Sequence, residues 1–214
     1  MIRTVLFVHG LESGPRGKKA AALEAAGFHV VAGQMPCGRS AVLRDPLVVT
    51  LLGAALAVSV AAAFAGGVWG FALGAGSVAL LQHVARPVVM RRIFRRSVDV
   101  QRALLAAHAI DAVVGSSFGG AVALELLHSG AWRGPTLLLC PAHHLVAQRA
   151  WTTAPALPVD ASQITVVHGR QDETVPVEHA RALVAGTSAR LLEVDDDHRL
   201  TASSRAENFA RWLG

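Results

Sequence analysis

The sequence predicts an α/β domain built on a mostly parallel sheet with helices on both faces. Apolar strand-like runs alternate along the chain with helix-like segments, and this alternation implies right-handed crossovers between parallel strands. The strand-like runs are almost continuously apolar, as strands are when helices cover both faces of a sheet. A third feature, an uncharged apolar run over residues 47–85, predicts an inserted two-helix hairpin.

The predicted elements follow one another in a regular order. Strands are predicted over residues 4–10, 28–33, 111–115, 135–140, 163–169 and 189–194, and helices over 14–27, 98–110, 118–130, 176–186 and 202–213. Gly27 and Gly130 stop two of these helices, and Pro176 lies near the start of another. We expect a catalytic domain formed by residues 1–46 and 97–214, interrupted by an insertion at 47–96.

Composition narrows the class of protein. The 214 residues suffice for one domain with a real core, and 52% of them are hydrophobic against 16% charged. The formal net charge is +5, but the chain has no Tyr and only 5% aromatic residues, which argues against a base-stacking RNA platform. We therefore expect no nucleic-acid partner.

The cysteines and the N-terminus indicate a cytoplasmic location. Cys37 and Cys140 have no metal-type spacing and form no disulfide framework, so we expect small buried side chains in a reducing compartment. The chain runs from Met1 directly into a strand-like segment, which is too short for a secretory signal.

The apolar run from 47 to 85 carries no Asp, Glu, Lys or Arg across 39 residues. Gly66-Gly67 divides it into pieces of 19 and 18 residues, and a membrane-spanning helix needs about 17–25 residues. Arginines flank both ends, at positions 39, 44, 86, 91, 92, 95 and 96. This pattern predicts a membrane hairpin with both ends on the cytoplasmic face of the inner membrane.

Two other interpretations of this run remain open. The two helices could form a lid over a pocket in a soluble protein, or a fully buried pair, with or without oligomerisation. Small residues four apart, at Gly66, Gly70 and Gly74 and at Gly53, Ala57, Ala61 and Ala65, would let the helices approach closely.

The segment GSSFGG, residues 115–120, lies between a predicted strand and a predicted helix. It matches G-x-S-x-G, the nucleophile elbow, in which a strained turn exposes the nucleophile beside a helix N-terminus. The register makes Ser117 the nucleophile and Ser116 its neighbour. A serine hydroxyl needs a base, and His198 follows the last predicted strand.

Asp172 completes a predicted triad, because the chain order Ser117, Asp172, His198 is that of an α/β-hydrolase. Asp195, Asp196 and Asp197 are rival acids, although a solvated loop is the simpler interpretation of that run. The backbone N–H groups of Phe118 and of Leu11, in the loop HGLESGP, are the predicted oxyanion-hole donors.

With these motifs in place, the chain resembles small bacterial serine esterases of the α/β-hydrolase fold. The matching stretches are HGLESGP at 9–15, GSSFGG at 115–120, HGRQDETVP at 168–176 and DDDH at 195–198. The resemblance does not extend over residues 47–96, which are an insertion relative to it. It implies a Ser-His-Asp hydrolase that requires no metal and no cofactor.

The predicted activity is hydrolysis of carboxylic esters or thioesters of apolar acyl groups through an acyl-enzyme, by a membrane-tethered protein. The expected partners are a small ester substrate and the membrane contacted by residues 47–85. A soluble esterase whose hairpin is a lid and a non-catalytic membrane-bound module of the same fold are the alternatives.

Overall fold

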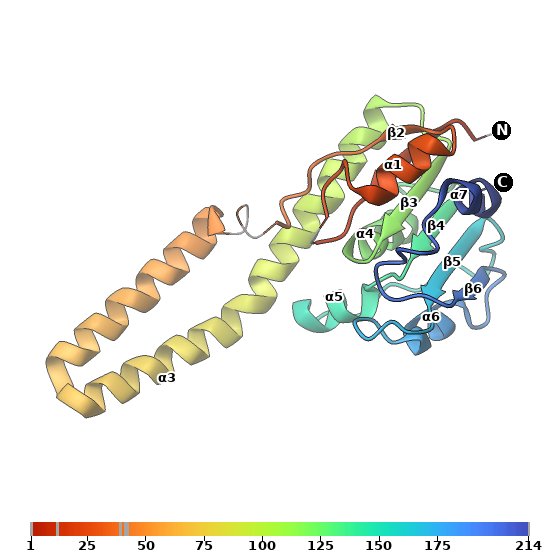
Figure 1. The fold of residues 1–214 in the computed structure, drawn as a ribbon. Helices are drawn as coiled ribbons and strands as arrows, with labels where there is room; N and C mark the ends of the chain where they lie inside the picture. The colour runs from red at the N-terminus through yellow and green to blue at the C-terminus, as the bar shows by residue number, and fades with distance from the viewer. Residues whose placement is uncertain (1, 12, 39, 41–42, 214) are drawn as a thin grey trace.

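The computed structural model describes residues 2–11, 13–38, 40 and 43–213, and its centre is a six-stranded sheet (Figure 1). The strands lie in the order β2-β1-β3-β4-β5-β6 and every neighbouring pair is parallel. Their bounds are Thr4–Val8 (β1), His29–Val31 (β2), Ala112–Ser116 (β3), Thr136–Leu139 (β4), Ile164–Gly169 (β5) and Arg190–Val194 (β6). All six lie where the sequence predicts strands, and the α/β fold class is confirmed.

Helices cover both faces of this sheet. Their bounds are Lys18–Ala25 (α1), Pro46–Ala107 (α3), Phe118–His128 (α4), His143–Ala150 (α5), Val177–Val184 (α6) and Ala206–Leu213 (α7). The sequence does not predict α5, because its eight residues begin two positions after Pro141 and offer only a short pattern.

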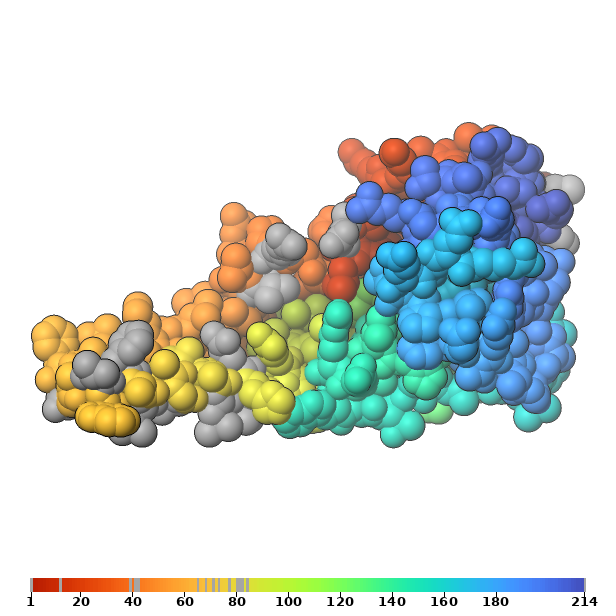
Figure 2. Space-filling view, turned by 60° about the horizontal axis from the view of Figure 1, so that its bottom comes forward, coloured from red at the N-terminus to blue at the C-terminus, as the bar shows by residue number. Residues whose placement is uncertain are grey.

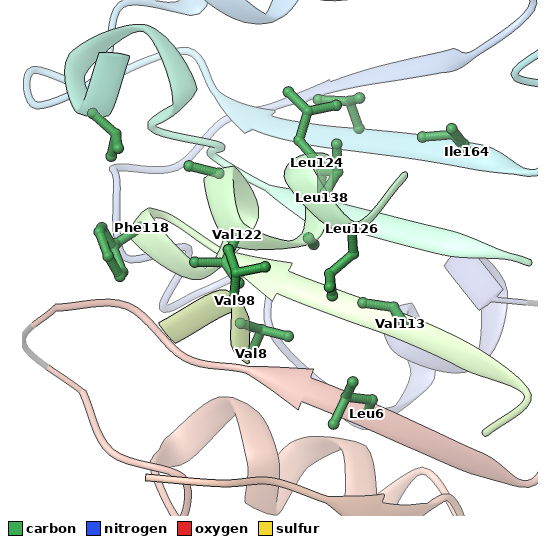
Figure 3. Packing of buried hydrophobic residues seen from close by; sticks show 14 of the residues in the cluster. Leu6, Val8, Val98, Val113, Phe118, Val122, Leu124, Leu126, Leu138 and Ile164 are labelled. Carbon is green, nitrogen blue, oxygen red and sulfur yellow. The ribbon is translucent and has the colours of Figure 1, made fainter. Parts of the chain in front are cut away.

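Two hydrophobic clusters fill the layers on either side of the sheet. On one face, α1 and α7 pack their apolar residues, among them Leu23 and Phe209, on β1, β3 and β4. On the other face, side chains of β1 and β3 such as Leu6 and Val113 pack with Val122 of α4 and Val98 of α3 (Figure 3). Alternate residues of each strand enter opposite clusters, which explains why the strands are apolar throughout.

The inserted segment is a helical hairpin that projects from the sheet domain (Figure 1, Figure 2). Within α3 one residue has a non-helical backbone, Gly67, with φ 54° and ψ −132°, at the Gly-Gly pair where the sequence predicts the turn. We call residues 46–66 the first arm and residues 68–107 the second arm.

The second arm differs from the prediction at its far end. The helix predicted over 98–110 is the last part of this arm, which continues without a break through the arginine-rich stretch to Ala107. Pro87 lies inside the helix and removes one backbone hydrogen bond, but the residues on both sides of it stay helical. The apolar arm is therefore joined rigidly to the part of α3 that packs on the sheet.

The two arms contact each other at only some of the small residues that are spaced four apart in the sequence. A methyl group added at Gly70 would lie 1.9 Å from the carbonyl oxygen of Ala62, and one at Gly74 would lie 3.2 Å from Ser59 Cα. Gly53 and Gly66 have nothing within 4 Å, and Ala57 and Ala61 are exposed. The first arm thus turns the face carrying Ser59 and Ala62 to its partner. The close approach expected from the four-residue spacing is found at Gly70 and Gly74 but not at Gly53, Gly66, Ala57 or Ala61, and the side chain of Ala65 lies outside the described residues.

The outward surface of the hairpin is apolar and open. Its exposed large side chains include Leu56 at 66%, Phe64 at 89% and Trp69 at 82%. Among the described residues, Pro46–Phe64 is the one helical segment long and apolar enough to cross a membrane, with a mean hydropathy of 2.4 and 6% of its window buried. The first arm is therefore not buried within a single copy of the chain.

The base of the hairpin is tied to the domain by polar contacts. Asp45 caps the first arm by accepting from the Leu47 N–H at 3.0 Å, and it pairs with Arg92 at 3.1 Å and with Arg96. Arg91 donates to the Ala150 carbonyl at 2.6 Å. Three of the flanking arginines therefore have protein partners, while Arg39 lies outside the described residues.

Candidate active site

Ser117 lies at the turn between β3 and α4, on the carboxyl edge of the sheet. Its backbone has φ 55° and ψ −115°, a strained conformation for a residue with a side chain. Backbone hydrogen bonds fix the turn to the end of β4 and to α4. The Ser117 N–H donates to the Leu139 carbonyl, and the Ser117 carbonyl accepts from the N–H groups of Gly120 and Ala142. This is the elbow geometry that GSSFGG predicts.

The glycines of the elbow are required by close backbone approaches. A methyl group at Gly119 would lie 2.0 Å from the Val8 carbonyl oxygen, so α4 touches the end of β1. One at Gly115 would lie 2.6 Å from the Gly119 carbonyl oxygen. Neither position has room for a side chain. Because glycine has no Cβ, the chain can make the tight turn that exposes Ser117 at the edge of the sheet.

The three residues of the predicted triad form a hydrogen-bonded chain. His198 Nε2 lies 2.9 Å from Ser117 Oγ, and His198 Nδ1 lies 2.7 Å from Asp172 Oδ2. Because an ionised carboxylate only accepts, Nδ1 carries the proton and donates to Asp172, which leaves the Nε2 lone pair facing the serine hydroxyl. This tautomer is the one a general base needs.

Asp172 is held as a carboxylate by four hydrogen-bond donors. Burial alone would raise its pKa, but hydrogen bonds from His168, His198 and the Val175 N–H hold the pKa of this carboxyl well below its usual range. Oδ1 accepts from the N–H groups of Thr174 at 2.9 Å and Val175 at 2.8 Å. The acid side chain is therefore fixed in orientation and charge.

His168 is a neighbour of the triad that sequence analysis did not assign. Its buried Nε2 lies 2.8 Å from the Val175 carbonyl oxygen and 3.3 Å from Asp172 Oδ2. Since both partners accept, Nε2 carries the proton and His168 donates to each of them. The signal for this residue is its place at the end of β5, four residues before the acid.

The rival acids make other contacts. Asp196 is buried and accepts from the N–H groups of Ser203 at 2.7 Å and Asp197 at 2.8 Å. Asp195 accepts from Gln171 at 2.7 Å, and Asp197 accepts from the Arg199 N–H at 2.8 Å. These contacts shape the loop that carries His198, and Asp172 is the acid that reaches the imidazole.

The two predicted oxyanion donors flank Ser117. Phe118 opens α4, and Leu11 follows Gly10, where an added methyl group would lie 3.4 Å from Ser117 Cβ. Within the described part of the chain, neither the Phe118 nor the Leu11 N–H donates to a protein group. The two amides thus stay the predicted oxyanion donors.

His9 supports the loop that carries Leu11. Its ring accepts from the Met35 N–H at Nε2, at 3.3 Å, and so donates from Nδ1 to the Gly10 carbonyl at 2.8 Å. The ring is fully buried and joins the ends of β1 and β2. His9 therefore has a structural role in the HGLESGP loop.

Lys19 and Cys140 lie close to the triad, and the sequence assigns neither of them to the site. Cys140 and Cys37 are buried and free, as the sequence predicts. Lys19 Nζ donates to Ser116 Oγ at 3.1 Å, and burial lowers its pKa although Asp197, Asp196 and Asp172 oppose the shift. Burial also raises the pKa of the Cys140 thiol, which stays protonated. Both residues are brought here by tertiary packing and lie in no local motif.

Metal binding is the other function that the side chains around the triad could have. Sulfur of Cys140, a carboxylate oxygen of Asp172 and a ring nitrogen of His198 lie within 4.8 Å of one another. However, the oxygens of Asp172 are already satisfied by His198, His168 and two backbone N–H groups, and the thiol is held protonated. The arrangement fits a hydrogen-bonded triad better than a metal centre.

Comparison with solved structures identifies the class of fold. A candidate hydrolase of the alpha/beta superfamily from Xanthomonas campestris pv. campestris is 23% identical, and the match covers 100% of this chain and 98% of that chain at a TM-score of 0.56. An alpha/beta hydrolase enzyme from a sediment metagenome of the Mar Chica lagoon, Morocco, is 12% identical, with coverages of 100% and 89% and a TM-score of 0.55.

A third similar structure is mouse alpha/beta hydrolase domain-containing protein 10, at 12% identity, coverages of 97% and 86%, and a TM-score of 0.52. No protein-family model and no curated protein matches the chain. The chain therefore has the α/β-hydrolase fold, as the resemblance of its motifs predicts, and its activity is argued below from its own site.

Proposed function

We propose that this protein is a serine hydrolase that cleaves carboxylic esters or thioesters of apolar acyl groups. The observation that carries the proposal is the hydrogen-bonded chain from Ser117 Oγ through His198 to Asp172, at 2.9 Å and 2.7 Å. It joins a nucleophile, a base in the productive tautomer and an orienting acid, which is the arrangement that activates a serine hydroxyl.

In the proposed reaction, His198 Nε2 takes the proton of Ser117 while the oxygen attacks the ester carbonyl carbon. The oxyanion that forms accepts hydrogen bonds from the Phe118 and Leu11 N–H groups. The tetrahedral intermediate then collapses, and His198 returns the proton to the departing alcohol or thiol. Asp172 stabilises the imidazolium in both steps.

Water completes the cycle. It gives a proton to His198 as its oxygen attacks the acyl-enzyme, and collapse of the second intermediate releases the carboxylic acid and restores the Ser117 hydroxyl. The two donors that stabilise the first oxyanion serve the second, so one site performs both halves of the reaction.

We infer further that the hairpin tethers the enzyme to the inner membrane with the catalytic part on the cytoplasmic face. The open apolar surface around Leu56, Phe64 and Trp69 supports this, since helices satisfy their own backbone and can face lipid. Arginines at the hairpin base suit the anionic headgroup region.

A serine-reactive fluorophosphonate probe tests the catalytic proposal. The full-length protein in detergent should react with the probe, and Ser117→Ala should not. The same pair should differ in hydrolysis of p-nitrophenyl acetate by at least about 10³-fold. A non-catalytic membrane module of the same fold would leave the probe unreacted in both proteins.

A further inference from the structure

A cavity lies between the hairpin base and the sheet domain, and no residue of the triad is among its described lining residues. Its volume is about 730 Å³ and its walls are predominantly apolar. Both arms of the hairpin contribute side chains, among them Leu51, Leu52 and Ala55 from the first arm and Val89, Met90 and Ile93 from the second. We call this cavity the hairpin groove.

The groove adjoins the candidate active site through two pairs of sequence neighbours. Leu11, the proposed second oxyanion donor, is one of the groove's lining residues, and it follows Gly10, where an added methyl group would lie 3.4 Å from Ser117 Cβ. The ring of Phe118 packs edge-on against Phe94, with centroids 6.0 Å apart, next to the groove residue Ile93. The groove therefore lies beside residues that neighbour the nucleophile, although Ser117, Asp172 and His198 are not among its described lining residues.

The lining selects for an apolar occupant. Among the described residues, its charged side chains are Arg86 and Arg149, both exposed, and the rest are aliphatic or sulfur-containing. A volume of this size lies within the range of small-molecule sites. The described lining contains no carboxylate or amide side chain that could bind a polar group of the ligand.

We propose that the hairpin groove binds the acyl chain of the ester whose carbonyl carbon Ser117 attacks, and that the substrate is a lipid ester. This inference rests on the proposed serine hydrolase activity. The hairpin then has two roles, because its outer faces contact lipid while its base forms the wall of the acyl site. A lipid chain can pass from the bilayer into the groove without crossing water.

Chain-length dependence tests this proposal on the full-length protein in detergent. Hydrolysis of p-nitrophenyl acetate and octanoate is compared, with kcat/KM as the readout. Each buried methylene should raise kcat/KM up to about fourfold, so the octanoate-to-acetate ratio of the natural protein should exceed about ten. Ala55→Trp, which fills the groove from the first arm, should lower that ratio about tenfold through loss of octanoate hydrolysis.

Ala57→Trp is the matched control, because Ala57 lies on the same arm but is exposed. It should keep the ratio of the natural protein. Ala85→Phe narrows the groove from the second arm and should act as Ala55→Trp does, which guards against misfolding of one variant.

The outcomes separate the two proposals. If acetate is hydrolysed but the ratio is the same in Ala55→Trp, Ala85→Phe and Ala57→Trp, the acyl chain binds elsewhere and the groove proposal is wrong. If the natural protein and Ser117→Ala hydrolyse acetate equally, the serine hydrolase proposal itself fails.

Discussion

Lys19 Nζ donates a hydrogen bond of 3.1 Å to Ser116 Oγ, the hydroxyl directly before the elbow serine. Two adjacent serines therefore have different partners, since Ser117 Oγ faces His198. The imidazole therefore faces Ser117 and not Ser116, whose hydroxyl has Lys19 as its partner.

This difference gives the first prediction. Ser117→Ala should abolish hydrolysis of a short p-nitrophenyl ester, while Ser116→Ala should keep activity within about tenfold, because it loses only a hydrogen bond of modest worth. Circular dichroism should show both variants folded. Loss of hydrolysis in Ser116→Ala alone would reverse the assignment of the nucleophile.

The second prediction concerns the acid of the triad. Asp172→Asn should lower kcat about 10³- to 10⁴-fold, because the amide no longer fixes the imidazole tautomer or stabilises the imidazolium. Asp196→Asn is the control: its carboxylate binds loop N–H groups at Ser203 and Asp197, so it should affect stability more than turnover. If folded samples of both variants lost kcat equally, the assignment of Asp172 as the acid would be wrong.

The third prediction is a pH dependence of stability. Burial, aided by the imidazoles of His144, His179 and His168, lowers the pKa of His143 from 6.5 to about 4. Between these two pH values the unfolded chain binds a proton at His143 that the folded protein does not bind. The contribution of His143 to the free energy of unfolding is therefore fully present above pH 6.5 and falls as the pH drops towards 4. The loss from this residue should reach about 3 kcal/mol.

Urea unfolding at pH 7 and pH 4.5 measures this effect. His143→Gln removes the titrating group, so its stability should fall less between the two pH values than that of the natural protein. Other titrating groups are shared and cancel in the comparison. Equal losses in both proteins would show that His143 does not resist protonation.

The fourth prediction tests the close approach of α4 to β1. Gly119→Ala should destabilise the fold by more than about 4 kcal/mol, because its methyl group would lie 2.0 Å from a backbone oxygen that cannot move aside. Gly38→Ala, with nothing within 4 Å of the added methyl, should change stability by less than about 1 kcal/mol. Thermal unfolding of both variants checks the contrast.

The fifth prediction concerns the hairpin. The full-length protein should fractionate with membranes and resist carbonate extraction. A shortened chain in which a Gly/Ser linker replaces residues 47–85 should be soluble and still react with the fluorophosphonate probe, since α3 from Arg86 onward, with Ile93 and Val98 in the core, is retained. A monomer that is soluble without detergent before the deletion would favour a lid instead.

The sequence by itself determined the strand positions, the elbow register at Ser117 and the turn of the hairpin at Gly66-Gly67. These features rest on local patterns, namely apolar runs, glycines at a tight turn and an uncharged stretch of fixed length, which a few neighbouring residues express. The chain order of Ser117, Asp172 and His198 also predicted a triad. The choice of Asp172 over the three aspartates at 195–197 was a prediction that the sequence could not decide.

The tertiary structure decided which groups meet. Asp172 rather than Asp196 reaches His198 because β5 and β6 lie side by side, and the end of β5 touches the loop after β6: a methyl group at Gly169 would lie 2.4 Å from the Asp196 carbonyl. His168, Lys19 and the hairpin groove likewise join elements far apart in the chain. Contacts of this kind depend on packing between elements, which local residue patterns do not encode.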